Sequence, residues 1–227
     1  MLFRSKAPPS DKTKWELVEA VVDPYLTSFY TLPEHYEFQA AIRRARFSSN
    51  QLPTGDFERE GNLDSVGWAY KPRFDAGEYN TSALLVGELP KQGERALELK
   101  LTPKDPVTAS PIVESARLEM VSPGVPVRPG QIARITGYVR APLGVSGSVD
   151  GAMIWDSIGG ETLALRFTRP GQWKKFTLYR PVHQAGELRL HMALTGAGRV
   201  HFDDLKVEIA DLGPLPLAEK SPSSSLR

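Results

Sequence analysis

The stretch PVRPGQIARITGYVRAPLGVSGSVDGAMIWDSIGG, residues 126–160, decides the fold class. Apolar side chains such as Ile135 and Val139 alternate there with polar ones such as Arg134 and Thr136. This period of two is typical of a half-buried β-strand. The turn signature Arg128-Pro129-Gly130 precedes the run, and residues 148–155 predict a second strand after a glycine-containing turn. The middle of the chain is therefore predicted to be an antiparallel ladder.

Short β-type runs separated by glycine and proline continue on both sides of this ladder. About ten strands at regular spacing, with no helical pattern between them, indicate an all-β antiparallel sandwich or barrel. The predicted strands are residues 55–60, 66–74, 83–86, 95–101, 112–121, 132–140, 148–155, 162–167, 174–181, 187–195 and 199–209.

The two ends of the chain have a different character. Residues 1–49 are predicted to form a helical arm, with one helix to about Val22 and a second from Pro33 whose apolar face includes Ala41 and Ile42. Such an arm needs a surface to pack on, either the sandwich at residues 50–210 or an upstream domain of the same polypeptide. Residues 211–227, rich in proline and serine, are predicted to be a disordered tail.

The composition limits partners and compartment. Lysine plus arginine number 28 against 27 aspartate plus glutamate, so no charge pattern predicts binding to nucleic acid or to a membrane. The absence of cysteine excludes disulfides, thiol nucleophiles and thiolate metal sites. Residues 1–12 lack the apolar core of a secretory signal. The chain is therefore expected to be intracellular or a piece of a longer exported protein, and in that case extracellular or at the cell surface.

Motifs for catalysis are missing from the sequence. The four histidines show no HExxH spacing, and no G-x-S-x-G elbow occurs. The glycines of SIGGE and LTGAGRV lie between β-type runs without a following helix, so they predict hairpin turns rather than phosphate loops. The chain is predicted not to be an enzyme, and a hydrolase with an atypical site is a remote alternative.

Four segments, in this order, resemble carbohydrate-binding jelly-roll modules of the family 4, 9 and 22 type, within the galactose-binding-domain-like group. They are LPTGDFERE (52–60) with Gly67-Trp68, VRPGQIARITGYVR (127–140), Gly171-Gln172-Trp173, and VHFDDLKVE (200–208). One departure is Thr54, where the family commonly has asparagine. The resemblance covers residues 50–210 and implies a jelly-roll β-sandwich. It also implies a noncatalytic module that docks a larger exported protein to polysaccharide.

Recognition of a polysaccharide or oligosaccharide needs an aromatic ring against the sugar and polar groups for its hydroxyls. If the strands at 132–140 and 187–195 share the concave sheet, their polar side chains converge, with one tryptophan near the rim. The predicted ligand-binding residues are Tyr138, Arg140, Trp155, Arg189 and His191. The alternative is that the aromatics are core residues and the charged groups form a solvated face. Trp68 and Trp173 are predicted to be packing residues.

The resemblance further implies a structural calcium between the first and last strands. Glu58, Asp203 and Asp204 stand at the matching positions and offer oxygen ligands. The alternative is that these acids merely begin a strand. A structural or protein-interaction sandwich without a sugar site, bracing a neighbouring catalytic domain, remains the alternative function.

Overall fold

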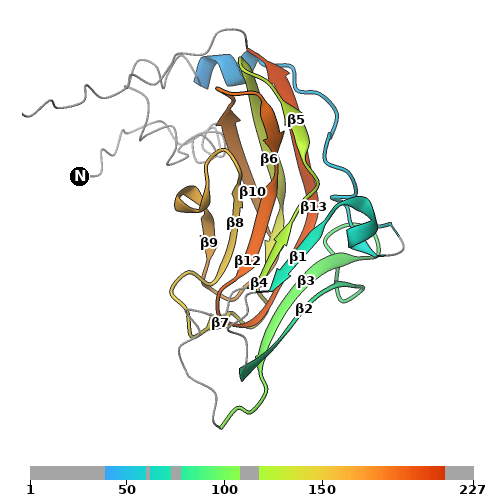
Figure 1. The fold of residues 1–227 in the computed structure, drawn as a ribbon, viewed down its shortest axis with the longest axis vertical. Helices are drawn as coiled ribbons and strands as arrows, with labels where there is room; N and C mark the ends of the chain where they lie inside the picture. The colour runs from blue at the N-terminus through green and yellow to red at the C-terminus, as the bar shows by residue number, and fades with distance from the viewer. Residues whose placement is uncertain (1–38, 60–61, 73–77, 108–117, 213–227) are drawn as a thin grey trace, which may run out of the picture.

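The computed structural model describes residues 39–59, 62–72, 78–107 and 118–212, in which two sheets face each other (Figure 1). We name them sheet A and sheet B. Sheet A has the strand order β1 (Ala69–Pro72), β4 (Leu118–Val121), β12 (Leu190–Leu194), β8 (Ala152–Asp156), β9 (Leu165–Phe167). Sheet B has the order β10 (Lys174–Pro181), β6 (Gln131–Arg140), β13 (Ala197–Asp211), β3 (Ala96–Pro103), β2 (Tyr79–Val86), with β7 (Val145–Ser146) beside β13. A small third sheet pairs β11 (Gly186–Leu188) with β5 (Val125–Val127).

Pairing among the described strands is antiparallel throughout, so the predicted all-β antiparallel sandwich is confirmed. The 3₁₀ turns Leu63–Val66 and Glu161–Leu163 lie before β1 and between β8 and β9. Residues 39–44 are α-helical. In these described ranges, no helix has the length and apolar character that crossing a membrane requires.

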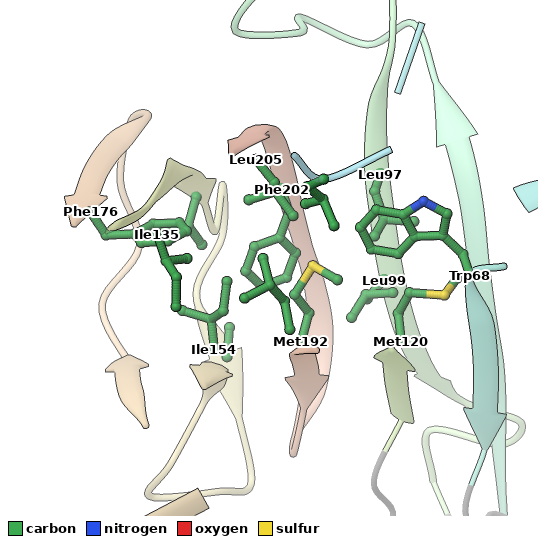
Figure 2. Close-up of a cluster of buried hydrophobic side chains, with 14 of the residues drawn as sticks. Trp68, Leu97, Leu99, Met120, Ile135, Ile154, Phe176, Met192, Phe202 and Leu205 are labelled. Atoms are coloured by element: carbon green, nitrogen blue, oxygen red, sulfur yellow. The ribbon is translucent and has the colours of Figure 1, made fainter. Parts of the chain in front are cut away.

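The core fills the space between the two sheets (Figure 2). Alternation places Ile135 of β6 and Met192 of β12 inward, in one cluster with Phe202 of β13 at its middle and Trp68 at its far end from Ile135. Full burial of one such side chain stabilises the fold by roughly 1.5–3 kcal/mol. The predicted packing role of Trp68 is confirmed, since it is 1% exposed.

One ion pair lies inside this apolar layer and joins the two sheets. Asp156 ends β8 of sheet A, and its Oδ2 accepts a 2.6 Å hydrogen bond from Nε of Arg180 in β10 of sheet B. Both side chains are 0% exposed. Asp156 Oδ1 accepts from the backbone N–H groups of Ile158 and Gly159, so the carboxylate also fixes the turn after β8.

The helix at residues 39–44 packs on one end of the outer face of sheet B (Figure 1). Ile42 contacts Ile132 and Tyr179, and Phe47 lies beside the same tyrosine with 6.2 Å between ring centroids. This part of the arm therefore uses the sandwich as its surface. The predicted helix to Val22 and the predicted start at Pro33 lie outside the described residues. The predicted tail starts too early, because Asp211 ends β13 and Leu212 N donates to Gly130 O at 2.9 Å; its remainder, residues 213–227, lies outside the described residues.

Two predicted strands are wrong. Residues 55–59 form a loop held to β13, because Leu205 N donates to Gly55 O at 2.8 Å. A Cβ on Gly55 would clash with the backbone carbonyl oxygen of Leu205, so this close approach of the loop to β13 requires glycine. The predicted strand 187–195 is two strands, since β11 pairs with β5 while β12 enters sheet A.

Candidate functional site

The five predicted ligand-binding residues divide between opposite outer faces of the sandwich. Tyr138 and Arg140 lie on β6 of sheet B, whereas Trp155 and His191 lie on β8 and β12 of sheet A. Arg189 precedes β12. The expected convergence required both strands in one sheet, and this condition is not met. Side-chain parity was predicted correctly, but parity does not reveal which sheet a strand joins.

The sheet A residues form a packed polar stack. Trp155 is only 6% exposed and lies against the His191 ring, with centroids 5.1 Å apart and planes 14° from parallel. His191 Nδ1 is 2.6 Å from Glu119 Oε1. Arg189 donates to the backbone oxygen of Ser122 at 3.2 Å and pairs with Glu187. These side chains are already engaged within the protein, and the tryptophan offers little accessible ring.

A different cluster occupies the open part of the outer face of sheet B. The register places Leu84, Glu98, His201 and Arg140 in one row across β2, β3, β13 and β6. Arg199, two residues before His201, holds Glu88 through both guanidinium Nη atoms at 2.8 and 3.2 Å. Charged groups from distant parts of the chain thus meet on one surface.

His201 is the buried centre of this row, with 0% exposure. Its Nε2 lies 3.2 Å from Glu98 Oε2, but the contact lacks hydrogen-bond geometry. Among the described residues neither ring nitrogen has a hydrogen-bond partner, and the same is true of Arg140 Nε. Burial lowers the pKa of His201; Glu98 opposes this shift, while Arg140 and Arg199 add to it. The imidazole is therefore neutral at pH 7 and can donate one hydrogen bond and accept another.

Two half-buried aromatic rings flank the row. Trp173 lies 6.3 Å from the His201 ring at 59°, and its Nε1 donates to Leu89 O at 3.1 Å. Lys91 Nζ stands 5.0 Å from the centroid of the Tyr138 ring. We name this surface the sheet B face, and its members are Glu98, Tyr138, Arg140, Trp173, Arg199, His201 and, from the β2–β3 loop, Glu88 and Lys91.

The β2–β3 loop, residues 87–95, is held in place by two of the predicted metal ligands. The Glu58 carboxylate accepts from the N–H groups of Glu94 at 3.0 Å and Arg95 at 3.1 Å. Asp203 Oδ2 accepts from the N–H groups of Lys91 at 2.7 Å and Gln92 at 3.0 Å. Burial raises the pKa of Asp203, and these backbone hydrogen bonds oppose that shift. Both acids therefore position the loop that carries Lys91 over Tyr138.

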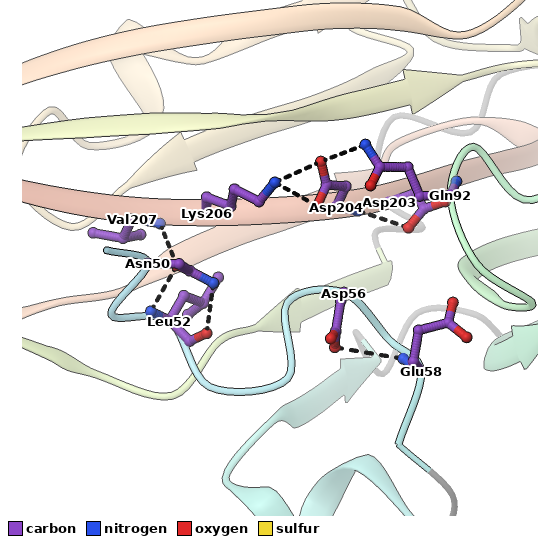
Figure 3. Close-up of polar contacts among 9 residues, drawn as sticks. All are labelled: Asn50, Leu52, Asp56, Glu58, Gln92, Asp203, Asp204, Lys206 and Val207. Atoms are coloured by element: carbon purple, nitrogen blue, oxygen red, sulfur yellow. Dashed lines mark hydrogen bonds and ion pairs between the residues drawn. The ribbon is translucent and has the colours of Figure 1, made fainter. Parts of the chain in front are cut away.

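The predicted calcium ligands Glu58, Asp203 and Asp204 do line one pocket (Figure 3). Lys206 Nζ lies 2.9 and 3.0 Å from the two Asp204 carboxylate oxygens, and Gln92 Nε2 donates to Oδ2 at 3.0 Å. Calcium prefers six to eight oxygen ligands, whereas these carboxylates face N–H donors. The described part of the chain contains no group of three or more acidic or histidine side chains arranged to hold a metal. The present arrangement does not fit a calcium cage, and the calcium remains a prediction.

Several members of the sheet B face were missed by sequence reasoning. Trp173 was predicted to be a packing residue, but it is half-buried beside His201. Arg199 and His201 alternate with the inward-facing Val200 and Phe202, so the alternation in the sequence could have predicted that both side chains point to the outer face. No local signal predicts Lys91, because the fold alone brings its loop to β6.

No family model matches the chain, and no curated protein matches it. Solved structures with a similar fold include several carbohydrate-binding β-sandwich modules. The family 61 module TmCBM61, solved with β-1,4-galactotriose, is 17% identical with a TM-score of 0.46, over 70% of this chain and 98% of that chain. The family 22 xylan-binding domain of Paenibacillus barcinonensis Xyn10C is 15% identical with a TM-score of 0.39, over 74% and 96%.

The enzymatically active domain of bacteriophage CBA120 tailspike protein 4 also matches. It is 10% identical with a TM-score of 0.47, and the match covers 70% of this chain but only 21% of that chain. Modules of families 4 and 16 are among the other matches. The solved structures of similar fold thus include the kind of carbohydrate-binding β-sandwich module that the sequence resembles.

Proposed function

We propose that the chain is a noncatalytic glycan-binding module of a larger exported protein, and that it binds its ligand on the sheet B face. The main support is that two partly exposed aromatic rings lie beside side-chain nitrogens that have no hydrogen-bond partner among the described residues. Tyr138 and Trp173 are half-buried, and Arg140 Nε and both His201 ring nitrogens between them have no hydrogen-bond partner among the described residues. Unsatisfied buried polar atoms are costly, so a ligand that completes them gains affinity.

The chemistry of this surface suits a pyranose ring. The apolar face of a sugar packs on an aromatic ring, and its hydroxyls both donate and accept hydrogen bonds. Arg140 supplies hydrogen-bond donors, and the neutral His201, which is 0% exposed, lies beneath the row rather than at the surface. The proposal keeps Tyr138 and Arg140 from the sequence prediction and adds Trp173 and His201. It leaves out Trp155, Arg189 and His191, whose contacts lie within sheet A and its flanks.

The test is retention on a panel of plant, algal and microbial polysaccharides by affinity electrophoresis. Trp173→Ala and Tyr138→Ala are each expected to weaken binding about tenfold, since stacking and cation–π contacts are worth about 1–2 kcal/mol. Phe47→Ala is the matched control, because this half-buried ring lies at the other end of the same sheet, beside Tyr179 and below the Arg134 guanidinium. A panel without any retention of the folded wild type would refute the proposal.

A protein-interaction module that braces a neighbouring domain is the second candidate. Leu84 in the row and Leu89 in the loop are 56% and 64% exposed, and such apolar groups favour a protein partner over a sugar. A blank glycan panel, together with loss of contact with an adjoining domain of the same polypeptide in Leu84→Ser, would favour this candidate.

A further inference from the structure

The sheet B face carries more cations than its carboxylates can neutralise. The two carboxylates of this face, Glu88 and Glu98, both form ion pairs with Arg199. Its Nη1 and Nη2 donate to Glu88, and Nη1 also lies 3.8 Å from Glu98 Oε2. Within the described ranges, no carboxylate pairs with Arg140, Lys91 or Lys175. Three cations, Arg140 and Lys91 on this face and Lys175 of β10 beside it, therefore lack a carboxylate partner, while the nearby Asp203 carboxylate accepts backbone N–H groups instead.

These three cations surround the accessible ring of Tyr138. Lys91 stands over the ring at 5.0 Å, and Lys175 of β10 is the register partner of Tyr138. Arg140 follows two residues later on the same strand and the same face. A sugar stacked on the part of the Tyr138 ring that Lys91 leaves open would thus lie close to all three positive charges.

Arg140 is suited to bind a planar anion. Its side chain is half-buried, and its Nε lacks a hydrogen-bond partner. A guanidinium presents parallel N–H donors that match the two oxygens of a carboxylate, and partial burial reduces screening by salt. An ammonium cannot reproduce this fork, so the arginine gives the site a preference for carboxylates.

We propose, on the basis of the glycan-binding function above, that the ligand is an acidic glycan whose uronic acid carboxylate binds Arg140 while its ring stacks on Tyr138. Lys91 and Lys175 stabilise the same negative charge from the two sides. The charge of the ligand, rather than the identity of its neutral sugars, then decides selectivity on this face.

The test compares two probes with one sugar backbone, polygalacturonate and its methyl-esterified form, by calorimetric titration of the full chain. The acidic form is expected to bind at least about tenfold more tightly, and salt should reduce this ratio. Arg140→Gln should remove most of the preference while affinity for the ester changes little. Lys91→Gln, an exposed position, should reduce the preference in part. Arg166→Gln is the matched control, because its partner Asp150 and its strand β9 lie on sheet A's side.

Each outcome bears on one of the two proposals. Equal affinity for the two probes, or an equal loss for both in Arg140→Gln, would overturn the acidic ligand while the glycan-binding function stands. Binding to a sulfated galactan but not to polygalacturonate would overturn the carboxylate assignment. No binding to either probe or to any neutral glycan would instead overturn the proposed function. Thermal melts of each variant establish that a loss does not come from unfolding.

Discussion

The Asp156–Arg180 ion pair offers a direct test of how the two sheets are held together. We expect Asp156→Asn to remove the charge while keeping the shape and the Oδ1 acceptor for the turn N–H groups. The Arg180 guanidinium is then left buried against a neutral amide. Because both side chains are 0% exposed, water cannot compensate for the lost partner. Breaking a buried pair in this way costs about 3–5 kcal/mol.

The assay is urea unfolding, which reports the free energy of unfolding. The matched control is Asp150→Asn, which breaks the Asp150–Arg166 pair, whose side chains are 40% and 38% exposed; its cost is expected to be about 0–1 kcal/mol. The double variant Asp156→Asn with Arg180→Met should recover part of the stability, since it leaves no buried charge unpaired and keeps the acceptor for the turn N–H groups. A cost below about 1 kcal/mol for Asp156→Asn would refute the reasoning.

Three further predictions concern the loops and the sheet B face. A chelator should leave the melting temperature unchanged, because Lys206 and N–H groups hold the carboxylates, whereas a clear drop on chelation would support the predicted calcium. Lys206→Met should lower the free energy of unfolding by about 1 kcal/mol. Thr54→Asn should raise the free energy of unfolding by about 1 kcal/mol, since Thr54 has φ 52° and asparagine tolerates that region better; an unchanged melt would contradict it. Burial lowers the pKa of His201, so the unfolded state binds more protons below about pH 6.5, and stability should fall as pH falls through that range. His201→Gln should flatten this slope in urea titrations, and an equally steep slope would exclude His201 as its source.

The strand pattern is the part of the fold that the sequence predicts well. Residues 131–140 form β6 with Ile135 inward and Arg134 outward, as the alternation requires. The sheet that each strand joins is not predictable in this way. It depends on β12 lying between β4 and β8, a pairing of segments far apart in the chain. The convergence expected of Tyr138 with His191 failed for this reason.

Thr54 illustrates what a departure from a family pattern can reveal. Thr54 adopts φ 52°, a conformation that β-branched side chains rarely accept and asparagine accepts more readily. The Thr54 hydroxyl also accepts a 2.9 Å hydrogen bond from Trp68 Nε1, a contact that an asparagine oxygen can make as well. The turn therefore favours a residue that tolerates positive φ at position 54, a requirement that the sequence alone does not reveal.

The acids at positions 58, 203 and 204 were grouped correctly, although their observed partners differ from those expected. A carboxylate in a sequence does not disclose whether a cation or an N–H group will meet it. Here the backbone of residues 91–95 and the Lys206 ammonium arrive from other parts of the chain. The family resemblance implied their common location, whereas their role depends on tertiary contacts.

The bulge in β13 connects these observations. The register of β13 against β6 shifts between Asp203 and Lys206, and Asp204 has φ 49°. The extra residue lets Asp203 cap the β2–β3 loop while Leu205 still reaches the core and donates its N–H to Gly55. A regular strand would send these two side chains to one face, because alternate residues share a face. The irregularity thus maintains the core and places Lys91 over Tyr138, so the recognition surface depends on a distortion of the strand beneath it.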